Sequence, residues 1–171
     1  MSNTYVYIEP EKYLMDVLAL LRSFYPENDI KPVIPESRDD VKAEAEALGY
    51  FFSIRFFNDG SANILFKGQM ITFERRIFEP GSENFAEDHF TRHKKALCRE
   101  LYSIFKEDTG RDLPWGMMNG VRPTKPAFIC ALAGRGKSEA ADYYASEYLV
   151  TKDKIDTSWD IARAELQVLS D

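Results

Sequence analysis

The chain has 171 residues, a net charge of −6, and contents of 44% hydrophobic and 13% aromatic residues. This length and apolar content suffice for one packed domain with a helical appendage, which argues against a disordered chain. The negative charge argues against a general nucleic-acid-binding surface and against a surface for anionic membranes, but it does not exclude a local basic pocket.

The cysteine content and the start of the chain indicate a cytoplasmic protein. Cys98 and Cys130 are the only cysteines. Two cysteines cannot form a disulfide framework, and we expect both to be small buried hydrophobic side chains. A strand-like pattern begins directly after the first four residues, and neither a signal peptide nor a long apolar span precedes it. We therefore expect no membrane segment.

The first 48 residues predict two short strands, a helix and an acidic segment. β-forming side chains indicate the strands, and apolar residues at helical spacing indicate a helix that ends before Pro26. The acidic, alanine-rich segment fits either a solvated helix or a mobile insertion. These elements cover residues 5–8 (strand), 10–25 (helix), 30–34 (edge strand) and 37–48 (acidic segment).

The next stretch predicts an antiparallel meander. Aromatic and aliphatic residues alternate in the pattern of strands, and Asn58-Asp59-Gly60 is typical of a hairpin turn. The aromatic side chains would suit a stacking platform for single-stranded nucleic acid, but such platforms need a basic groove, so we expect most rings in the core. The three strands cover residues 50–57, 62–67 and 69–78.

The remaining elements are helical. A long amphipathic helix ends near Gly110, and Ser138 and Thr151 suit the N-caps of two later helices. A sheet-containing half followed by an all-helical half predicts an α+β fold with a small antiparallel meander sheet and packed helices. We expect an α+β domain over residues 1–112 and a loop with a helical segment over residues 113–171. The three later helices cover residues 123–133, 139–150 and 152–169.

The last helix carries a continuous apolar seam. Its residues follow at spacings of four, three, four and three: Ile155, Trp159, Ala162, Leu166 and Leu169. This seam fits packing on its own domain. It also fits a helix that leads into, or docks on, a following domain.

Residues 113–126 form the most distinctive segment, with three prolines, two glycines, a tryptophan and a basic pair. Proline fixes φ and glycine permits unusual backbone angles, so the loop has a specified shape. Arg122 and Lys125 lie at an expected helix N-terminus, where backbone N–H groups favour anions. Alternatively, Arg122 ties the loop to Asp108, Asp112 or a C-terminal carbonyl. For Trp115 we expect packing in a core or an interface.

The runs Leu-Pro-Trp-Gly at 113–116 and Gly-Val-Arg-Pro-Thr-Lys at 120–125 resemble a motif of one enzyme family. That family is the oxygen-independent coproporphyrinogen III dehydrogenases of the HemZ type, which are radical S-adenosylmethionine enzymes with a long N-terminal extension. The resemblance covers the chain from about Leu97 to its C-terminus. Met118-Asn119 depart from the family pattern, which has a Leu-Thr or similar pair there.

The resemblance implies that the chain is the N-terminal region of a longer enzyme. Radical S-adenosylmethionine enzymes hold a 4Fe–4S cluster on Cys-x-x-x-Cys-x-x-Cys. This chain lacks that motif, so the cluster and S-adenosylmethionine would bind to a catalytic barrel after Asp171. The family's reaction converts two propionates of a porphyrinogen to vinyl groups by oxidative decarboxylation.

From the resemblance we expect a non-catalytic accessory domain that shapes substrate access or supports the barrel. Four residues are expected to contact an anionic tetrapyrrole or the downstream catalytic domain: Trp115, Arg122, Thr124 and Lys125. The alternative is a stand-alone interaction module that binds a protein through the apolar seam and the proline-rich loop. A small independent enzyme fits least, because no nucleophile–base pair is visible.

Two further patterns are weaker. Residues 134–138 resemble the end of a phosphate-binding P-loop, but the motif needs a glycine where Ala131 stands, so a capped connector between helices fits better. His89 and His93 have the spacing of two metal ligands on one helix face. No further cysteine or histidine completes a cluster, so we expect no metal site and two solvent-facing histidines.

Overall fold

The computed structural model of the chain describes residues 3–34, 36–57, 61–73, 89–118 and 122–170. The chain divides into two units, Met1–Leu101 and Tyr102–Asp171. This division falls inside the longest helix, α3 (His89–Thr109). The α+β fold class is confirmed, because a small sheet with helices is followed by a helical part of the chain.

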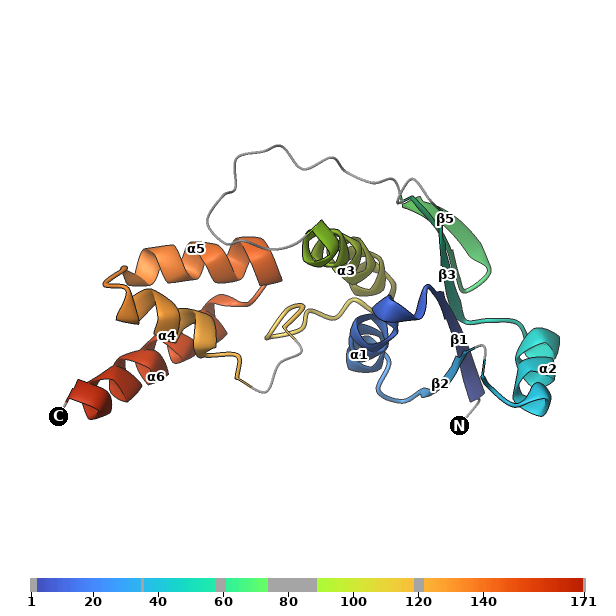
Figure 1. The fold of residues 1–171 in the computed structure, drawn as a ribbon, viewed down its shortest axis with the longest axis horizontal. Helices are drawn as coiled ribbons and strands as arrows, with labels where there is room; N and C mark the ends of the chain where they lie inside the picture. Colours follow the sequence, from blue (N-terminus) through green and yellow to red (C-terminus); the bar gives the residue numbers. More distant parts are fainter. Residues whose placement is uncertain (1–2, 35, 58–60, 74–88, 119–121, 171) are drawn as a thin grey trace. The chain divides into compact units, whose positions relative to one another are not determined.

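The first unit contains a five-stranded sheet with the strand order β2-β1-β3-β4-β5 (Figure 1). β1 pairs in parallel with β2 and β3, and β3, β4 and β5 form an antiparallel meander. The predicted meander and the predicted edge strand β2 are confirmed, and the parallel pairs make the sheet a mixed one. The turn at 58–60 and residues 74–78 lie outside the described residues. The strands are β1 (Asn3–Glu9), β2 (Asp29–Val33), β3 (Phe52–Phe56), β4 (Ala62–Phe66) and β5 (Gln69–Phe73).

Helical crossovers account for the parallel pairs. A short 3-10 helix, η1 (Glu11–Tyr13), and α1 (Leu14–Phe24) connect β1 to β2, and α2 (Asp39–Leu48) connects β2 to β3. Parallel neighbours need such crossovers, because a tight turn would reverse the chain direction. The helices α1 and α2 lie on opposite sides of the sheet (Figure 1).

The acidic segment is the helix α2, which decides between the two expectations for it. Ala45 is buried in a cluster with Tyr5 and Val33, and Val41 and Tyr50 pack against this cluster. The charged side chains at the start of α2 are exposed. One small apolar stripe is therefore enough to hold this helix on the sheet.

His93 lies in an aromatic box, so the expectation that it faces solvent is wrong. Its Nδ1 atom is 2.9 Å from the Tyr13 hydroxyl oxygen, and the rings of Tyr13, Phe56 and Phe73 lie 5.5–5.8 Å from its ring. Only 7% of His93 is exposed. The physical reason is helical spacing, because His93 precedes the fully buried Leu97 by one turn and shares its apolar face.

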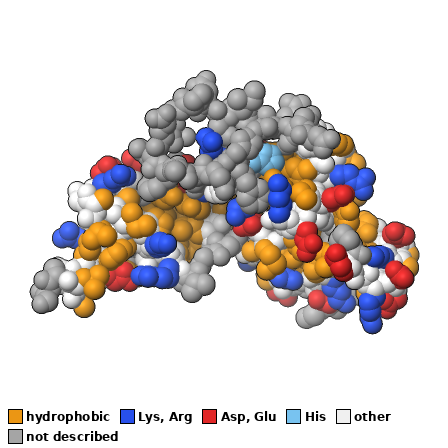
Figure 2. All heavy atoms as spheres, viewed as in Figure 1, with side chains coloured by type: hydrophobic (Ala, Val, Ile, Leu, Met, Phe, Trp, Pro, Cys, Tyr) orange, Lys and Arg blue, Asp and Glu red, His pale blue; other side chains and the backbone are white. Residues whose placement is uncertain are grey.

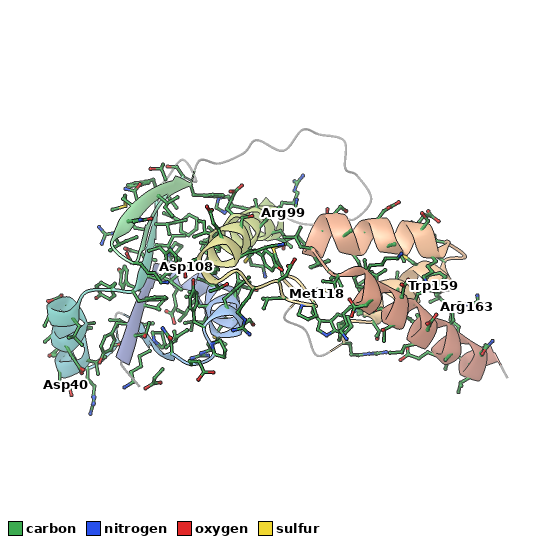
Figure 3. All side chains as sticks on the ribbon, turned by 180° about the vertical axis from the view of Figure 1, so that it is seen from behind. Asp40, Arg99, Asp108, Met118, Trp159 and Arg163 are labelled. Carbon is green, nitrogen blue, oxygen red and sulfur yellow. The ribbon has the colours of Figure 1, made fainter. Side chains whose placement is uncertain are left out.

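The second unit is built from the end of α3 and three further helices, α4, α5 and α6, which pack on one another. Their core is a cluster of Ala127, Tyr144, Val150, Ile155 and Ala162. Figure 3 labels Met118 and Trp159, which pack against this cluster. The three helices are α4 (Lys125–Leu132), α5 (Lys137–Tyr148) and α6 (Lys152–Ser170).

The cap prediction is wrong for α5 and partly confirmed for α6. Ser138 lies inside α5, whose N-cap is Gly136. The Glu139 carboxylate accepts a hydrogen bond from the Gly136 N–H at 3.0 Å, so the acidic side chain reaches back to the N-cap residue. Thr151 does precede α6, and its carbonyl accepts the N–H of Ile155 at 3.0 Å.

The apolar seam of α6 has a packed part and an exposed part. Ile155 and Ala162 are buried in the core cluster, and Trp159 packs against it. Leu169, at the other end of the seam, is 73% exposed. Packing on its own unit therefore accounts for the first three seam residues but not for the last.

Candidate functional site

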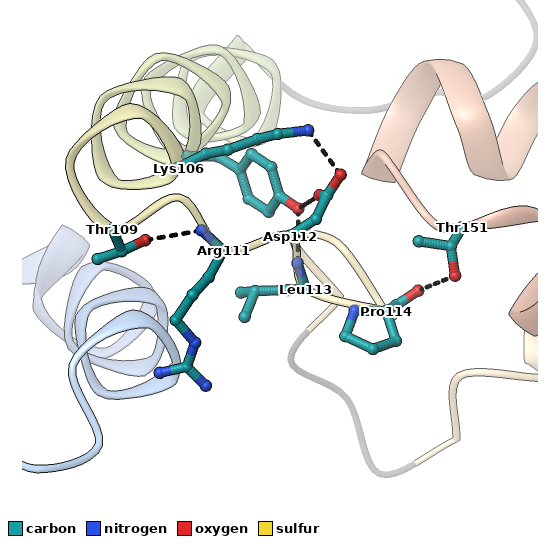
Figure 4. Close-up of polar contacts among 8 residues, drawn as sticks. Lys106, Thr109, Arg111, Asp112, Leu113, Pro114 and Thr151 are labelled. Carbon is teal, nitrogen blue, oxygen red and sulfur yellow. Dashed lines mark hydrogen bonds and ion pairs between the residues drawn. The ribbon is translucent and has the colours of Figure 1, made fainter.

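The distinctive loop begins at a polar cluster on the end of α3 (Figure 4). Tyr102 donates a hydrogen bond from its hydroxyl to Asp112 and accepts one from the Leu113 N–H at 3.0 Å. The Lys106 ammonium donates to the second Asp112 oxygen at 2.6 Å. These bonds fix the chain direction at the point where the loop leaves α3.

The pKa values of the two acids in this cluster shift in opposite directions. The Lys106 ammonium, and then the Tyr102 hydroxyl, lower the pKa of Asp112. Burial, and then the hydrogen bond to Asp112, raise the pKa of Tyr102 to about 12. Asp112 is therefore ionised and Tyr102 neutral at neutral pH, which is the combination that their hydrogen bond requires.

The Leu-Pro-Trp-Gly run docks on the junction between α5 and α6 through its backbone. The Met117 N–H donates to the Tyr148 carbonyl at 2.8 Å, and the Thr151 N–H and hydroxyl each lie 3.0 Å from the Pro114 carbonyl (Figure 4). Gly116 has a φ of +55°, and a Cβ atom there would lie 2.0 Å from the Tyr148 carbonyl oxygen. Only glycine fits this close approach.

Trp115 is held between the loop and the helices. Its ring packs against the core cluster of the second unit and is partly buried. The Lys154 ammonium lies 5.9 Å from the centroid of the ring, which is within the range of a cation–π contact. The site residue Trp115 is thus a packing residue of its own unit, and its role toward a substrate or another domain stays a prediction.

A buried tyrosine joins the second half of the loop to the helices. The hydroxyl of Tyr144, which is fully buried on α5, donates to the Pro123 carbonyl at 2.6 Å and accepts the Ala127 N–H at 3.2 Å. Burial raises the pKa of Tyr144. One neutral hydroxyl thereby satisfies a loop carbonyl and a free N–H of the first turn of α4.

Arg122 pairs with a residue on α6. Its Nη2 atom lies 3.7 Å from an oxygen of Glu165, and 64% of the Arg122 side chain is exposed. Asp112, one of the partners expected for Arg122, is held by Lys106 and Tyr102. An exposed ion pair of this length contributes little to stability, so the guanidinium can turn toward another anion at low cost.

Thr124 and Lys125 lie at the start of α4, as the sequence predicts. Thr124 is the N-cap residue, with a helical backbone and no side-chain capping bond. Lys125 is the first residue of the helix and is exposed, and its ammonium has no hydrogen-bond or ion-pair partner among the described residues. Arg122 and Lys125 are therefore both presented to solvent at one helix terminus.

The segment resembling a P-loop is a connector between helices, as expected. It follows the helix α4, whereas a P-loop follows a strand. Gly134 has a φ of +72°, and the Arg135 N–H bonds to the Cys130 carbonyl at 2.9 Å. These features end a helix, and α5 begins directly afterwards at Lys137.

The thiols are held in their protonated form. Burial, and then the Asp16 charge, raise the pKa of Cys98 to about 12, and burial raises the pKa of Cys130. In the described part of the chain, no group of three or more His, Cys, Asp or Glu side chains is arranged to hold a metal ion. The side chain of His89 lies outside the described residues.

Comparisons of the chain with protein-family models, curated proteins and solved structures gave no significant match. Among the described helices, none combines the length and apolar character that crossing a membrane requires.

Reasoning from the sequence missed the residues that hold the loop in place. Tyr102, Lys106 and Asp112 are separated by spacings of four and six, and the first spacing puts two polar side chains on one face of α3. That spacing was a usable signal. Tyr144 gave no such signal, because its bonds join segments about twenty residues apart in the chain.

Proposed function

We propose that this chain is a non-catalytic accessory region of a coproporphyrinogen-dehydrogenase-like radical S-adenosylmethionine enzyme. In this proposal it supports the catalytic barrel or shapes the access of a propionate-bearing tetrapyrrole. The 4Fe–4S cluster and S-adenosylmethionine would be held by the catalytic domain, outside these residues. The proposal starts from the motif resemblance at 113–116 and 120–125.

One structural observation carries the proposal further. The first motif run is used internally, with Gly116 pressed on the α5–α6 junction, whereas the basic residues of the second run are exposed. Among the described residues, Arg122 is paired only with Glu165, at 3.7 Å, and Lys125 has no side-chain partner. A helix terminus that presents two cations suits contact with carboxylates of a substrate or of another domain.

The first experiment is to determine the native reading frame beyond the codon for Asp171. An open frame that continues into a Cys-x-x-x-Cys-x-x-Cys motif supports the proposal. A stop codon at that point overturns the enzyme assignment and favours a stand-alone interaction module.

A matched pair of variants then tests the role of Arg122 in the full-length enzyme. If Arg122 contacts the substrate or the barrel, Arg122→Ala lowers turnover or substrate affinity, whereas Glu165→Ala leaves both unchanged. If Arg122 serves only its pair with Glu165, the two variants behave alike. Unchanged kinetics in Arg122→Ala would remove the contact role.

The interaction-module alternative rests on exposed apolar residues in the second half of α6. Ile161, Val168 and Leu169 are all exposed there. If this surface serves a separate partner protein, the chain should self-associate with increasing concentration, and Val168→Ser with Leu169→Ser should abolish that association. Sedimentation velocity measures both. A monomer at all concentrations would count against this alternative.

A further inference from the structure

The segment around α4 is basic in an acidic protein. Residues 113–138 contain four basic residues and no aspartate or glutamate. Because the whole chain has a net charge of −6, the rest of the chain carries a net charge of −10. Two of the four cations are paired with α6, since Lys137 bonds to Asp156 at 2.8 Å and Arg122 lies near Glu165.

The other two cations stand at the two ends of α4. Lys125 is its first residue, and Arg135 follows its C-terminus, where the Arg135 N–H bonds to the Cys130 carbonyl. Both side chains are exposed. Within the described ranges, neither side chain has a hydrogen-bond or ion-pair partner, so both positive charges are open to a ligand.

Between these cations, α4 is apolar on its outer side as well as on its inner side. The inner side packs through Ala127, Cys130 and Phe128. Ile129 and Leu132 are nevertheless 41% and 65% exposed, and they follow Lys125 at helical spacings of four and seven. A helix that is apolar all round is normally covered on both sides.

Figure 2 shows hydrophobic side chains gathered over the α4 and α6 part of the chain, with Lys and Arg side chains beside them. We define the α4 face as Lys125, Ile129, Leu132 and Arg135. Its chemistry is an aliphatic centre with a positive charge at each end of the helix.

We propose that the α4 face docks a protein surface in which carboxylates flank an aliphatic centre. Charge complementarity selects carboxylates, and the exposed isoleucine and leucine select an apolar partner surface. A nucleic acid fits less well, because the α4 face has no aromatic residue for base stacking and the remaining chain is strongly acidic. Under the proposed function, this partner surface belongs to the catalytic domain. Only that assignment rests on the proposed function.

The test uses this chain and a short fluorescent, alanine-based helical peptide. In the peptide, two leucines on one face are flanked by a glutamate at each end, and in its control both glutamates are glutamines. Fluorescence anisotropy should show salt-sensitive binding of the glutamate peptide, at least about tenfold tighter than that of the glutamine peptide. Equal affinities would overturn the proposal.

Variants locate the binding on the α4 face. Lys125→Glu with Arg135→Glu should weaken binding by at least about tenfold, and Ile129→Thr with Leu132→Thr should weaken it severalfold. The matched control, Arg38→Glu with Lys152→Glu, changes the net charge by the same amount outside this face and should keep the wild-type affinity. Circular dichroism checks that every variant is folded. Loss of binding in the control alone would contradict the location.

Other ligands of the α4 face would give different results in the binding test. Tighter binding of a single-stranded oligonucleotide or of phosphatidylglycerol vesicles than of the glutamate peptide would overturn the proposal in favour of a phosphate-bearing partner. Self-association that Lys125→Glu with Arg135→Glu abolishes would assign the α4 face to a second copy of the chain. A stop codon after Asp171 would end the enzyme proposal and leave the peptide result standing, whereas failed peptide binding leaves the reading frame unaffected.

Discussion

The two halves of the distinctive loop, residues 113–118 and residues 122–125, differ in whether they are bonded to the rest of the unit or exposed. Residues 113–118 are joined to α5 and α6 by backbone hydrogen bonds and by the close approach at Gly116. Arg122 and Lys125 stand at a helix terminus that Tyr144 holds through Pro123, and both side chains are exposed, with Arg122 near Glu165. A motif can therefore combine residues that build a scaffold with residues that the scaffold presents.

The largest effect is expected from adding a methyl group at Gly116, in the half of the loop that is bonded to α5 and α6. In Gly116→Ala the new Cβ would lie 2.0 Å from the Tyr148 carbonyl oxygen, on a residue with positive φ. We expect the free energy of unfolding to fall by about 3 kcal/mol or more, measured by urea denaturation.

Gly134→Ala is the matched control for that variant. Gly134 also has a positive φ, of +72°, but its Cβ position has no atom within 4 Å. The cost should therefore be only the backbone strain of about 1–2 kcal/mol. Equal losses in the two alanine variants would show that the close approach at Gly116 contributes nothing.

A smaller loss is expected from removing the Tyr144 hydroxyl, which joins the second half of the loop to the helices. Tyr144→Phe keeps the buried ring but leaves the Pro123 carbonyl and the Ala127 N–H without this partner. The expected cost is about 2 kcal/mol in the free energy of unfolding. Hydrogen exchange should show faster exchange of the Ala127 amide. An unchanged exchange rate would mean that the hydroxyl does not hold this terminus.

The polar cluster at the start of the loop should give a pH-dependent effect. The pKa of Asp112 is lowered in the folded chain, so its carboxylate contributes stability above the unfolded pKa of about 4, and this is lost as the pH falls through the folded pKa. Asp112→Asn should cost at most about 1 kcal/mol at pH 7, because the carboxylate is half exposed and screened. The difference from wild type should shrink as the pH falls and vanish once the pH is below the lowered pKa of Asp112 in the folded chain. A difference that does not shrink as the pH falls would point to a cause other than ionisation.

The smallest effect on the free energy of unfolding is expected in the exposed half of the loop. Arg122→Ala should change the free energy of unfolding by less than about 0.5 kcal/mol, because the pair with Glu165 is long and exposed. Glu165→Ala should behave the same way in thermal denaturation. If Arg122→Ala lowered the free energy of unfolding by more than about 2 kcal/mol, this arginine would have a structural role instead.

Sequence patterns predicted the elements well where one physical signal dominates. Alternating side chains located β3 and β4, helical spacing located α1 and α6, and prolines marked β2 as an edge strand. The same patterns did not give the parallel pairing of β1 with both neighbours. Strand pairing depends on which crossover helix packs on which face, and that is a contact between distant segments.

The candidate site shows the same division. The chain by itself determined a shaped loop before a helix, with Arg122 and Lys125 at that helix terminus, because proline, glycine and charge act locally. Only the tertiary structure decided that Gly116 is pressed against α5, that Tyr144 holds Pro123, and that His93 is buried. These outcomes depend on packing between segments far apart in the sequence, which no local pattern records.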